Sequence, residues 1–239
     1  MTNLNPHISI DCVVFGFDSK KIKVLLIERE KIEHEKSKVH KLKLPGNLIL
    51  ENEDPDASAN RTLKELTGLE NIFLKQFHVF GAPDRLRPPE DLEWLRTTTK
   101  MTVDRVVTVA YYSLIQLNES NLTDKTIWHP VDDLPELVFD HNQIIQKALE
   151  ALQREVRTEP VCFELLPPKF TIREMQNIYE AILGKEMDNR NFRKKIIPLK
   201  FLVNLREKEQ GVSHKPAQLY KFDRKIYAKH RKEISGFNL

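Results

Sequence analysis

Cysteine is scarce in this sequence. The 239 residues contain only Cys12 and Cys162, which are far apart and lack the paired spacing of a zinc site. A disulfide framework or a metal cluster is therefore not expected, and both thiols are predicted to be plain core residues. Long apolar runs are also missing, since stretches such as residues 12–15 are far too short to cross a membrane. The N-terminus has neither a basic segment ahead of an apolar core nor a small-residue cleavage site, so a cytoplasmic protein is expected.

Internal repeats and low-complexity tracts are absent as well, and the overall composition is ordinary. Hydrophobic residues make up 40% of the chain and charged residues 31%, which is typical of a globular protein rather than a disordered or fibrous one. The length fits a medium domain followed by a small one, so two domains are expected.

The charge is unevenly distributed along the chain. From residue 161 to the end there are 17 Lys and Arg against 9 Asp and Glu, whereas the first 160 residues carry 21 against 26. A basic third next to an acidic remainder suggests that the C-terminal part meets a polyanion. A solvated basic surface would explain the same numbers, so composition alone leaves both readings open.

In the first 156 residues, β-branched and aromatic residues predict strands, and apolar residues at helical spacing predict helices. The expected strands cover residues 8–18, 22–28, 41–45, 73–80 and 105–117, and the expected helices cover residues 54–66 and 140–156. Asp54 and Pro55 open the first helix and Gly68 ends it. The polar stretch 83–102 is longer than a compact connection, and it is predicted to be a lid, a dimer arm or a mobile loop.

The C-terminal part reads differently. Residues 157–169 contain three prolines and no sustained period, which predicts a linker. Helices are expected from Thr171 to Gly184 and over residues 188–197, followed by short strands at 201–205 and 218–222 around a polar loop. Helix, turn, helix and β-wing is the order of a winged helix-turn-helix domain.

Residues 44–69, LPGNLILENEDPDASANRTLKELTGL, resemble the Nudix box, G-x5-E-x7-R-E-U-x-E-E-x-G-U with U aliphatic. Aligned on Gly68, the chain keeps Glu53, Arg61, Leu63, Glu65, Gly68 and Leu69. It departs at three positions. Asn47 stands at the first glycine, with Gly46 beside it, and Thr62 and Leu66 replace two glutamates.

These departures bear on catalysis. In Nudix enzymes the two replaced glutamates, together with the one that matches Glu65, hold the divalent ions that polarise a diphosphate and activate water. A hard cation needs several oxygen ligands, so the resemblance implies that hydrolysis is lost or residual and that no metal or other cofactor is bound. Arg61 and Glu65 lie four residues apart on one predicted helix and can form an ion pair, which explains their retention by structure alone.

The resemblance extends over nearly the whole chain. PVDDLPELVFDH, from Pro130, and the pair Asp84 and Arg85 after Phe80-Gly81 are similar to the Nudix half of the Nudix-related transcriptional regulators. FTIREMQNIYEAILGKEMDNRNFRKKI, from Phe170, and HKPAQLY, from His214, resemble their winged-helix half. The implied fold is α+β, a Nudix α/β/α sandwich with a mixed sheet over residues 1–157 and a winged helix-turn-helix over residues 158–239. The insertion after Arg85 departs from the family pattern.

The second helix of the C-terminal part is predicted to bind DNA. Phe192 and Ile196 share one face of it and the polar side chains point outward. Arginine and asparagine can make bidentate contacts to guanine and adenine, whereas lysine serves mainly phosphate. The predicted contacts to a double-stranded operator are Arg190, Asn191, Arg193, Lys194 and Lys195 on the helix, with His214 and Lys215 at the wing tip. A homodimer is the default arrangement on a two-fold operator.

The resemblance also implies a small-molecule effector in the Nudix cleft. Polar residues near the strand ends are the candidates, namely Arg29, Lys43, Glu65 and His141. Lys43 could instead be the exposed position of an alternating strand, and His141 a residue of a helix start. Members of the family sense ADP-ribose-type nucleotides or a sugar, notably L-arabinose. Because the box has lost a glycine and two metal ligands that a pyrophosphate would use, a pentose is favoured and an ADP-ribose-type nucleotide comes next.

Three functions remain in competition. The leading hypothesis is a transcriptional regulator, and more specifically a repressor of a sugar or cofactor operon, with an inactive Nudix domain that binds the effector. The second is a Nudix hydrolase of ADP-ribose or a related compound with an accessory DNA-binding tail, against which Thr62 and Leu66 argue. The third is a nucleic-acid-binding module with an inert Nudix domain, since the sequence identifies no effector residue with certainty.

Overall fold

The computed structural model describes residues 3–30, 42–86, 89–117, 122–213 and 215–230. The chain forms two compact units. The first combines Met1–Gly16 with Lys23–Leu149, and the second combines Phe17–Ile22 with Glu150–Leu239. In the described residues, no helix combines the length and the apolar character needed to cross a membrane.

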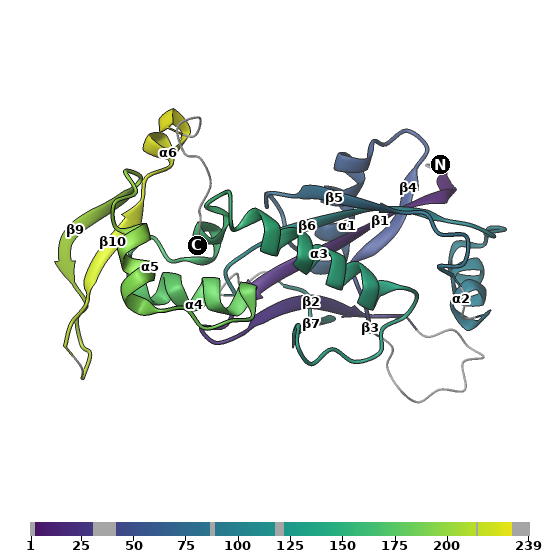
Figure 1. The fold of residues 1–239 in the computed structure, drawn as a ribbon. Coiled ribbons are helices and arrows are strands. Elements are labelled where there is room, and N and C mark those ends of the chain that lie inside the picture. The colour runs from purple at the N-terminus through teal and green to yellow at the C-terminus, as the bar shows by residue number, and fades with distance from the viewer. Residues whose placement is uncertain (1–2, 31–41, 87–88, 118–121, 214, 231–239) are drawn as a thin grey trace. The chain divides into compact units, whose positions relative to one another are not determined.

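The first unit contains a seven-stranded sheet with the order β3-β2-β1-β6-β5, in which β4 pairs with β1 and β7 pairs with β2 (Figure 1). The strands are β1 (Leu4–Phe17), β2 (Ile22–Glu28), β3 (Leu42–Lys43), β4 (Gly46–Leu50), β5 (Lys75–Phe80), β6 (Val107–Leu114) and β7 (Thr126–Pro130). Strands β1 and β6 are parallel, whereas β1 and β4 are antiparallel. The sheet is therefore mixed, as predicted. Sequence patterns did not reveal β4 and β7.

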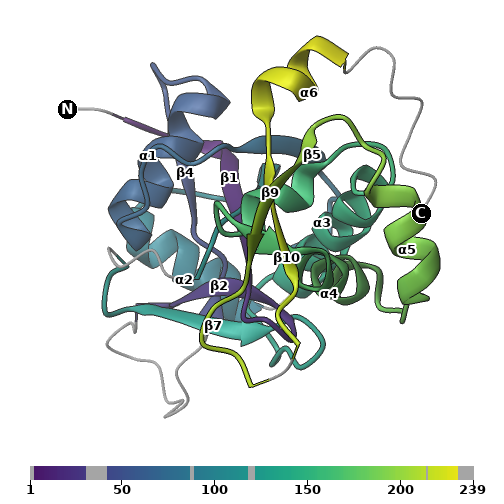
Figure 2. The same cartoon turned by 90° about the vertical axis from the view of Figure 1, so that its left-hand side faces the viewer.

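Helices cover both faces of this sheet. Every residue from Ile10 to Gly16 in β1 is buried, which is typical of a strand with a helix on each side. Helices α1 (Pro55–Thr67) and α3 (His141–Glu155) lie on opposite faces (Figure 2). On the α1 side, Ala59 and Leu63 pack in one buried cluster with residues of β1, including Cys12. Asp54 caps the start of α1 and Gly68, in the left-handed region, ends it, as the sequence predicts.

The insertion between β5 and β6 contains a helix, α2 (Pro89–Thr99), whereas a mobile loop was one of the three predicted forms. Its apolar residues Leu92 and Leu95 pack with Met101 against a buried cluster of Leu48, Val103 and Val106. Burial of this apolar face gives the helix a tertiary reason to form. The helix borders the cavity described below, and its roles as a lid or a dimer arm stay predictions.

The second unit is a winged helix. Its elements are η1 (Val161–Leu165), β8 (Phe170–Thr171), α4 (Ile172–Leu183), α5 (Asn189–Ile196), β9 (Leu202–Lys208), β10 (Gln218–Phe222) and α6 (Arg224–His230). Strand β10 lies between β8 and β9 and is antiparallel to both. Thr171 and Glu174 form the predicted capping box of α4, and Gly184 ends that helix. Only η1, β8 and α6 were absent from the sequence prediction.

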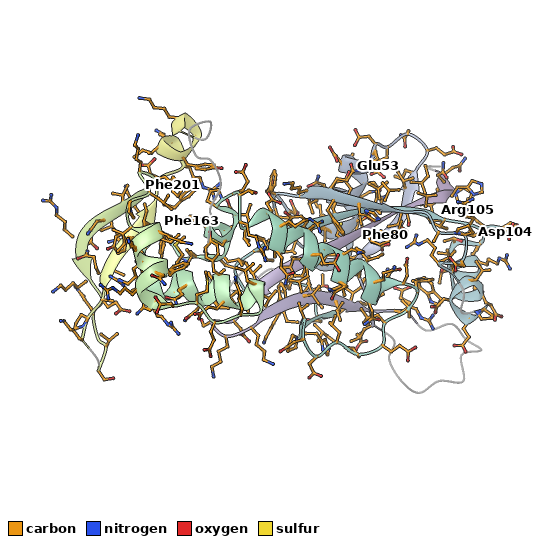
Figure 3. The ribbon with its side chains drawn as sticks, viewed as in Figure 1. Glu53, Phe80, Asp104, Arg105, Phe163 and Phe201 are labelled. Atoms are coloured by element: carbon orange, nitrogen blue, oxygen red, sulfur yellow. The ribbon has the colours of Figure 1, made fainter. Side chains whose placement is uncertain are left out.

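An aromatic cluster forms the core of the wing side of this unit. The Phe163 ring stacks on Phe222 with 4.2 Å between centroids, and Phe201 meets Phe163 edge-on at 6.1 Å (Figure 3). The prediction of a linker over residues 157–169 was wrong for its centre, because Cys162, Phe163 and Leu165 are buried. The prolines interrupt the helical period there, but the apolar side chains between them belong to the core.

Candidate functional site

A cavity of about 370 Å³ lies within the first unit, bordered by β1, β3, β4, β6, α2 and the start of α3. One side, which we call the polar wall, consists of Ser9, Asp11, Lys43, Arg85, Thr108 and His141. The apolar residues that line the cavity, which we call the apolar wall, are Leu48, Leu86, Trp94, Leu95, Val106 and Phe139. A concave apolar site with a few convergent polar groups is the usual form of a small-molecule site.

Asp11 is central to the polar wall. It lies in the buried run of β1, opposite Gly46 of β4, and is 6% exposed. Burial raises the pKa of its carboxyl group, while the Arg85 and Lys43 cations and the Thr108 hydroxyl act in the opposite direction. A Cβ atom on Gly46 would lie 1.9 Å from Asp11 Oδ1, so only glycine allows the two strands to pair here.

His141 is neutral. Its Nδ1 atom accepts a hydrogen bond from the Leu44 backbone N–H at 2.9 Å, so the ring proton is assigned to Nε2, which faces Asp11 Oδ1 at 3.6 Å. Burial, reinforced by the Lys43 and Arg85 charges, lowers the pKa of His141 to about 3. The imidazole therefore offers the cavity side of the wall an N–H group and no charge.

Two cations complete the polar wall in different ways. Lys43 Nζ donates to the Gly46 carbonyl at 2.8 Å, and burial lowers the lysine pKa. Arg85 donates from Nε and Nη2 to the two oxygens of Asp140, at 3.0 and 2.7 Å. Its Nη1 donates to Thr108 Oγ1 and lies 3.5 Å from the Val106 carbonyl oxygen. All three guanidinium nitrogens are thus held by the protein.

The carboxylate that Arg85 contacts belongs to Asp140, at the start of α3. Asp140 directly precedes α3, at the start of the helix predicted over residues 140–156, and both of its carboxylate oxygens accept from Arg85. Of the Asp84 and Arg85 pair noted in the sequence, Arg85 therefore forms a buried ion pair with Asp140. The guanidinium is 5% exposed and the Asp140 carboxylate is 12% exposed.

Buried polar contacts hold α2 at the cavity. Asp91 accepts from Arg29 Nη1 at 3.1 Å and from the Phe139 backbone N–H at 2.7 Å. Trp94 Nε1 donates to the Glu30 carbonyl at 2.7 Å, and the Arg29 guanidinium lies 5.3 Å from the Trp94 ring centroid. Arg29 therefore does not line the cavity, and its contacts with Asp91 and Trp94 position α2.

The residues of the box form an ion-pair network at α1. Arg61 donates to both oxygens of Glu53 at 2.8 Å and to Glu65 at 3.1 Å, which confirms the predicted i,i+4 pair. The hydrogen bonds from Arg61 hold the pKa of Glu53 below its usual range. Thr62 is fully buried.

This arrangement does not fit a divalent metal ion. The oxygens of Glu53 are engaged by a cation, and Thr62 and Leu66 offer no carboxylate. Over the ranges that the structure describes, no cluster of three or more His, Cys, Asp or Glu side chains could hold an ion.

Two of the four predicted effector residues line the cavity and two do not. Lys43 and His141 line the cavity, whereas Arg29 and Glu65 do not, because Arg29 pairs with Asp91 and the half-exposed Glu65 pairs with Arg61. Sequence reasoning missed Asp11 and Trp94. A charged residue inside the otherwise apolar run of β1 was the available signal for Asp11, whereas nothing in the sequence marked Trp94.

The second unit presents a basic helix. In α5, Phe192 and Ile196 are buried, and Phe192 lies edge-on to Tyr179 of α4 at 5.6 Å between centroids. The predicted DNA-contacting residues of this helix, Arg190, Asn191, Arg193, Lys194 and Lys195, are all exposed. Asp188 caps the helix by accepting from the Asn191 backbone N–H. Lys215 is exposed between β9 and β10, and His214 lies outside the described residues.

Comparison with known proteins agrees with both units. A NUDIX domain model matches residues 5–152, and a model of the NrtR DNA-binding winged helix domain matches residues 162–222. A curated relative from Acinetobacter baylyi, the ADPR responsive transcriptional repressor NtrR, is 28% identical over 91% of this chain and 82% of its own length.

Solved structures share the fold. NrtR of Shewanella oneidensis, complexed with a 27mer DNA, has a TM-score of 0.73 at 24% identity and covers 92% of this chain and 95% of its own. A second crystal structure of Shewanella oneidensis NrtR has a TM-score of 0.70 at 25% identity and covers 90% of this chain and 94% of its own. The α+β fold with a winged helix is thereby confirmed.

The preference for a pentose effector finds no support in these comparisons. The curated relative is described as responsive to ADP-ribose, the effector that the sequence interpretation placed second. The loss of metal ligands does not by itself favour a pentose, because a regulator can bind a diphosphate without hydrolysing it and so without the metal that hydrolysis requires.

Proposed function

The chain belongs to the Nudix family, in the branch whose Nudix domain is followed by an NrtR-type winged helix, and we propose that it is a DNA-binding repressor that responds to ADP-ribose. In this proposal the winged helix binds operator DNA, the cavity of the first unit binds the nucleotide, and the chain acts as a homodimer. The resemblance to a curated repressor over most of both chains supports this function.

The observation that carries the DNA-binding part is the exposed basic face of α5. Asp188, Phe192 and Ile196 fix the start and the orientation of the helix, and the opposite side exposes Arg190, Asn191, Arg193 and Lys194. A helix with exposed arginine and asparagine residues suits the major groove, where these side chains read guanine and adenine edges.

The cavity suits a nucleotide rather than a free pentose. Its apolar wall offers Trp94 and aliphatic side chains to an aromatic base, and its polar wall offers hydroxyl, lysine and carboxyl groups. A pentose alone presents no aromatic face to the apolar wall. ADP-ribose contains both kinds of surface in one molecule.

The proposed function is tested with the full-length protein and a duplex enriched by it from a random-sequence library. Fluorescence anisotropy should show specific binding, and ADP-ribose should weaken it, whereas L-arabinose should have no effect. A duplex affinity that ADP-ribose leaves unchanged at saturating concentration would contradict the proposed effector. Failure to enrich any sequence would contradict the regulator.

Hydrolysis is expected to be negligible. With Mg²⁺ or Mn²⁺, the purified protein should not turn over ADP-ribose, because two of the metal-holding carboxylates are replaced by Thr62 and Leu66 and Glu53 is paired with Arg61. Release of AMP and ribose 5-phosphate is measured by chromatography, with an active Nudix hydrolase as the positive control. Turnover that Glu65→Gln abolishes would show instead that the box is catalytic.

A further inference from the structure

Asp11 supplies the carboxyl group of the polar wall, with a side chain that is 9% exposed, and Glu28 and Glu30 also line the cavity. The neighbours of Asp11 leave it few direct hydrogen bonds. Among the described residues, Thr108 donates to it, while His141 Nε2 at 3.6 Å and Arg85 Nη2 at 4.0 Å lie beyond hydrogen-bond distance. Since a carboxylate can accept about four hydrogen bonds, Asp11 has acceptor capacity directed at a ligand.

The charges and hydrogen-bonding groups of the polar wall indicate which part of a nucleotide would contact Asp11. A phosphate group would be repelled by the Asp11 carboxylate at close range in a buried site. Arg85 offers a phosphate little direct hydrogen bonding, because each of its guanidinium nitrogens already has an acceptor in the protein. A vicinal diol suits the site better, since two hydroxyl groups can donate to the two carboxylate oxygens while Lys43 Nζ donates back to them.

We propose that Asp11 binds the terminal ribose of ADP-ribose and is the residue by which this protein distinguishes ADP-ribose from ADP. The inference rests on the proposed function, since it assigns a part of that effector to one wall of its cavity. ADP-ribose contains two riboses, and the terminal one is the better candidate. The terminal ribose is bonded to the rest of the molecule at one side only, whereas the other ribose bears both the base and a phosphate. It can therefore contact Asp11 without the cavity having to accommodate a further group beyond it.

Isothermal titration of the full-length protein with ADP-ribose and with ADP tests this assignment. The wild type should bind ADP-ribose about tenfold more tightly than ADP, which is the scale of a hydrogen bond to a charged group. Asp11→Asn should weaken the binding of ADP-ribose about tenfold and so lose this difference. The amide keeps one acceptor oxygen and turns the other into a donor, so the two hydroxyl groups no longer meet one acceptor oxygen each.

Asp133→Asn is the matched control, because it makes the same change at an exposed residue outside the cavity, and it should keep the wild-type difference. Thermal melting verifies that each variant is folded, and Asp11→Ser is the second variant if the asparagine variant is not. If the Asp11 variants retain the preference for ADP-ribose, or lose affinity for ADP equally, the assignment is wrong. Wild-type protein that binds no ADP-ribose would overturn the proposed function itself, before any variant is made.

Discussion

Replacing Arg85 with alanine is expected to lower the free energy of unfolding by about 3–5 kcal/mol, the range for breaking a buried ion pair by removing one partner. The guanidinium is 5% exposed and donates twice to Asp140. Its loss leaves the Asp140 carboxylate without its partner and also removes the nearest arginine from Asp11. Both tryptophans, Trp94 and Trp128, lie in the first unit, so their fluorescence in urea reports its unfolding.

Arg105→Ala is the control for Arg85→Ala. That arginine is exposed and donates a hydrogen bond to the Gly81 carbonyl at 3.0 Å, so its loss should change stability by no more than about 0.5 kcal/mol. Adding Asp140→Asn to Arg85→Ala should recover part of the lost stability, because the unpaired charge is then removed. If the double variant is no more stable than Arg85→Ala, the unpaired Asp140 carboxylate is not the cause.

Local signals predicted most of the fold because they act over short distances. The capping box at Thr171, the glycines that end α1 and α4, and the buried run of β1 specify their elements without help from distant residues. The elements that were missed depend on partners far along the chain. Strand β7 is defined by pairing with β2, about a hundred residues earlier, and α2 is stabilised by packing on residues of β4 and the segment before β6.

The site was harder to predict for the same reason. Arg29 and Lys43 look alike in sequence, as cations at or near the ends of adjacent strands, yet one is paired with Asp91 and the other lines the cavity. Asp91 lies 62 positions away from Arg29, on a helix that the sequence did not reveal. The role of a buried charge is set by its partner, and only the tertiary structure supplies that partner.

The basic residues of α5 are exposed, as the sequence predicts, and their proposed contact with DNA gives the second large effect. Replacing both Arg190 and Arg193 with alanine should weaken binding to the selected duplex by about 1–3 kcal/mol for each residue that contacts a guanine edge. Both side chains are exposed on α5. Binding to a scrambled duplex should fall much less, because base contacts contribute only to the specific complex.

Lys194→Ala separates the two kinds of contact. If Lys194 binds phosphate, its loss should weaken all duplexes about equally and reduce the salt dependence of binding by about one unit, because fewer counterions are released. Arg96→Ala, in which an exposed arginine of α2 is removed, should change neither quantity. Anisotropy at several salt concentrations measures both. Unchanged binding in the arginine and lysine variants would mean that α5 does not enter the groove, and the basic charge of the C-terminal unit would then be only a solvated surface.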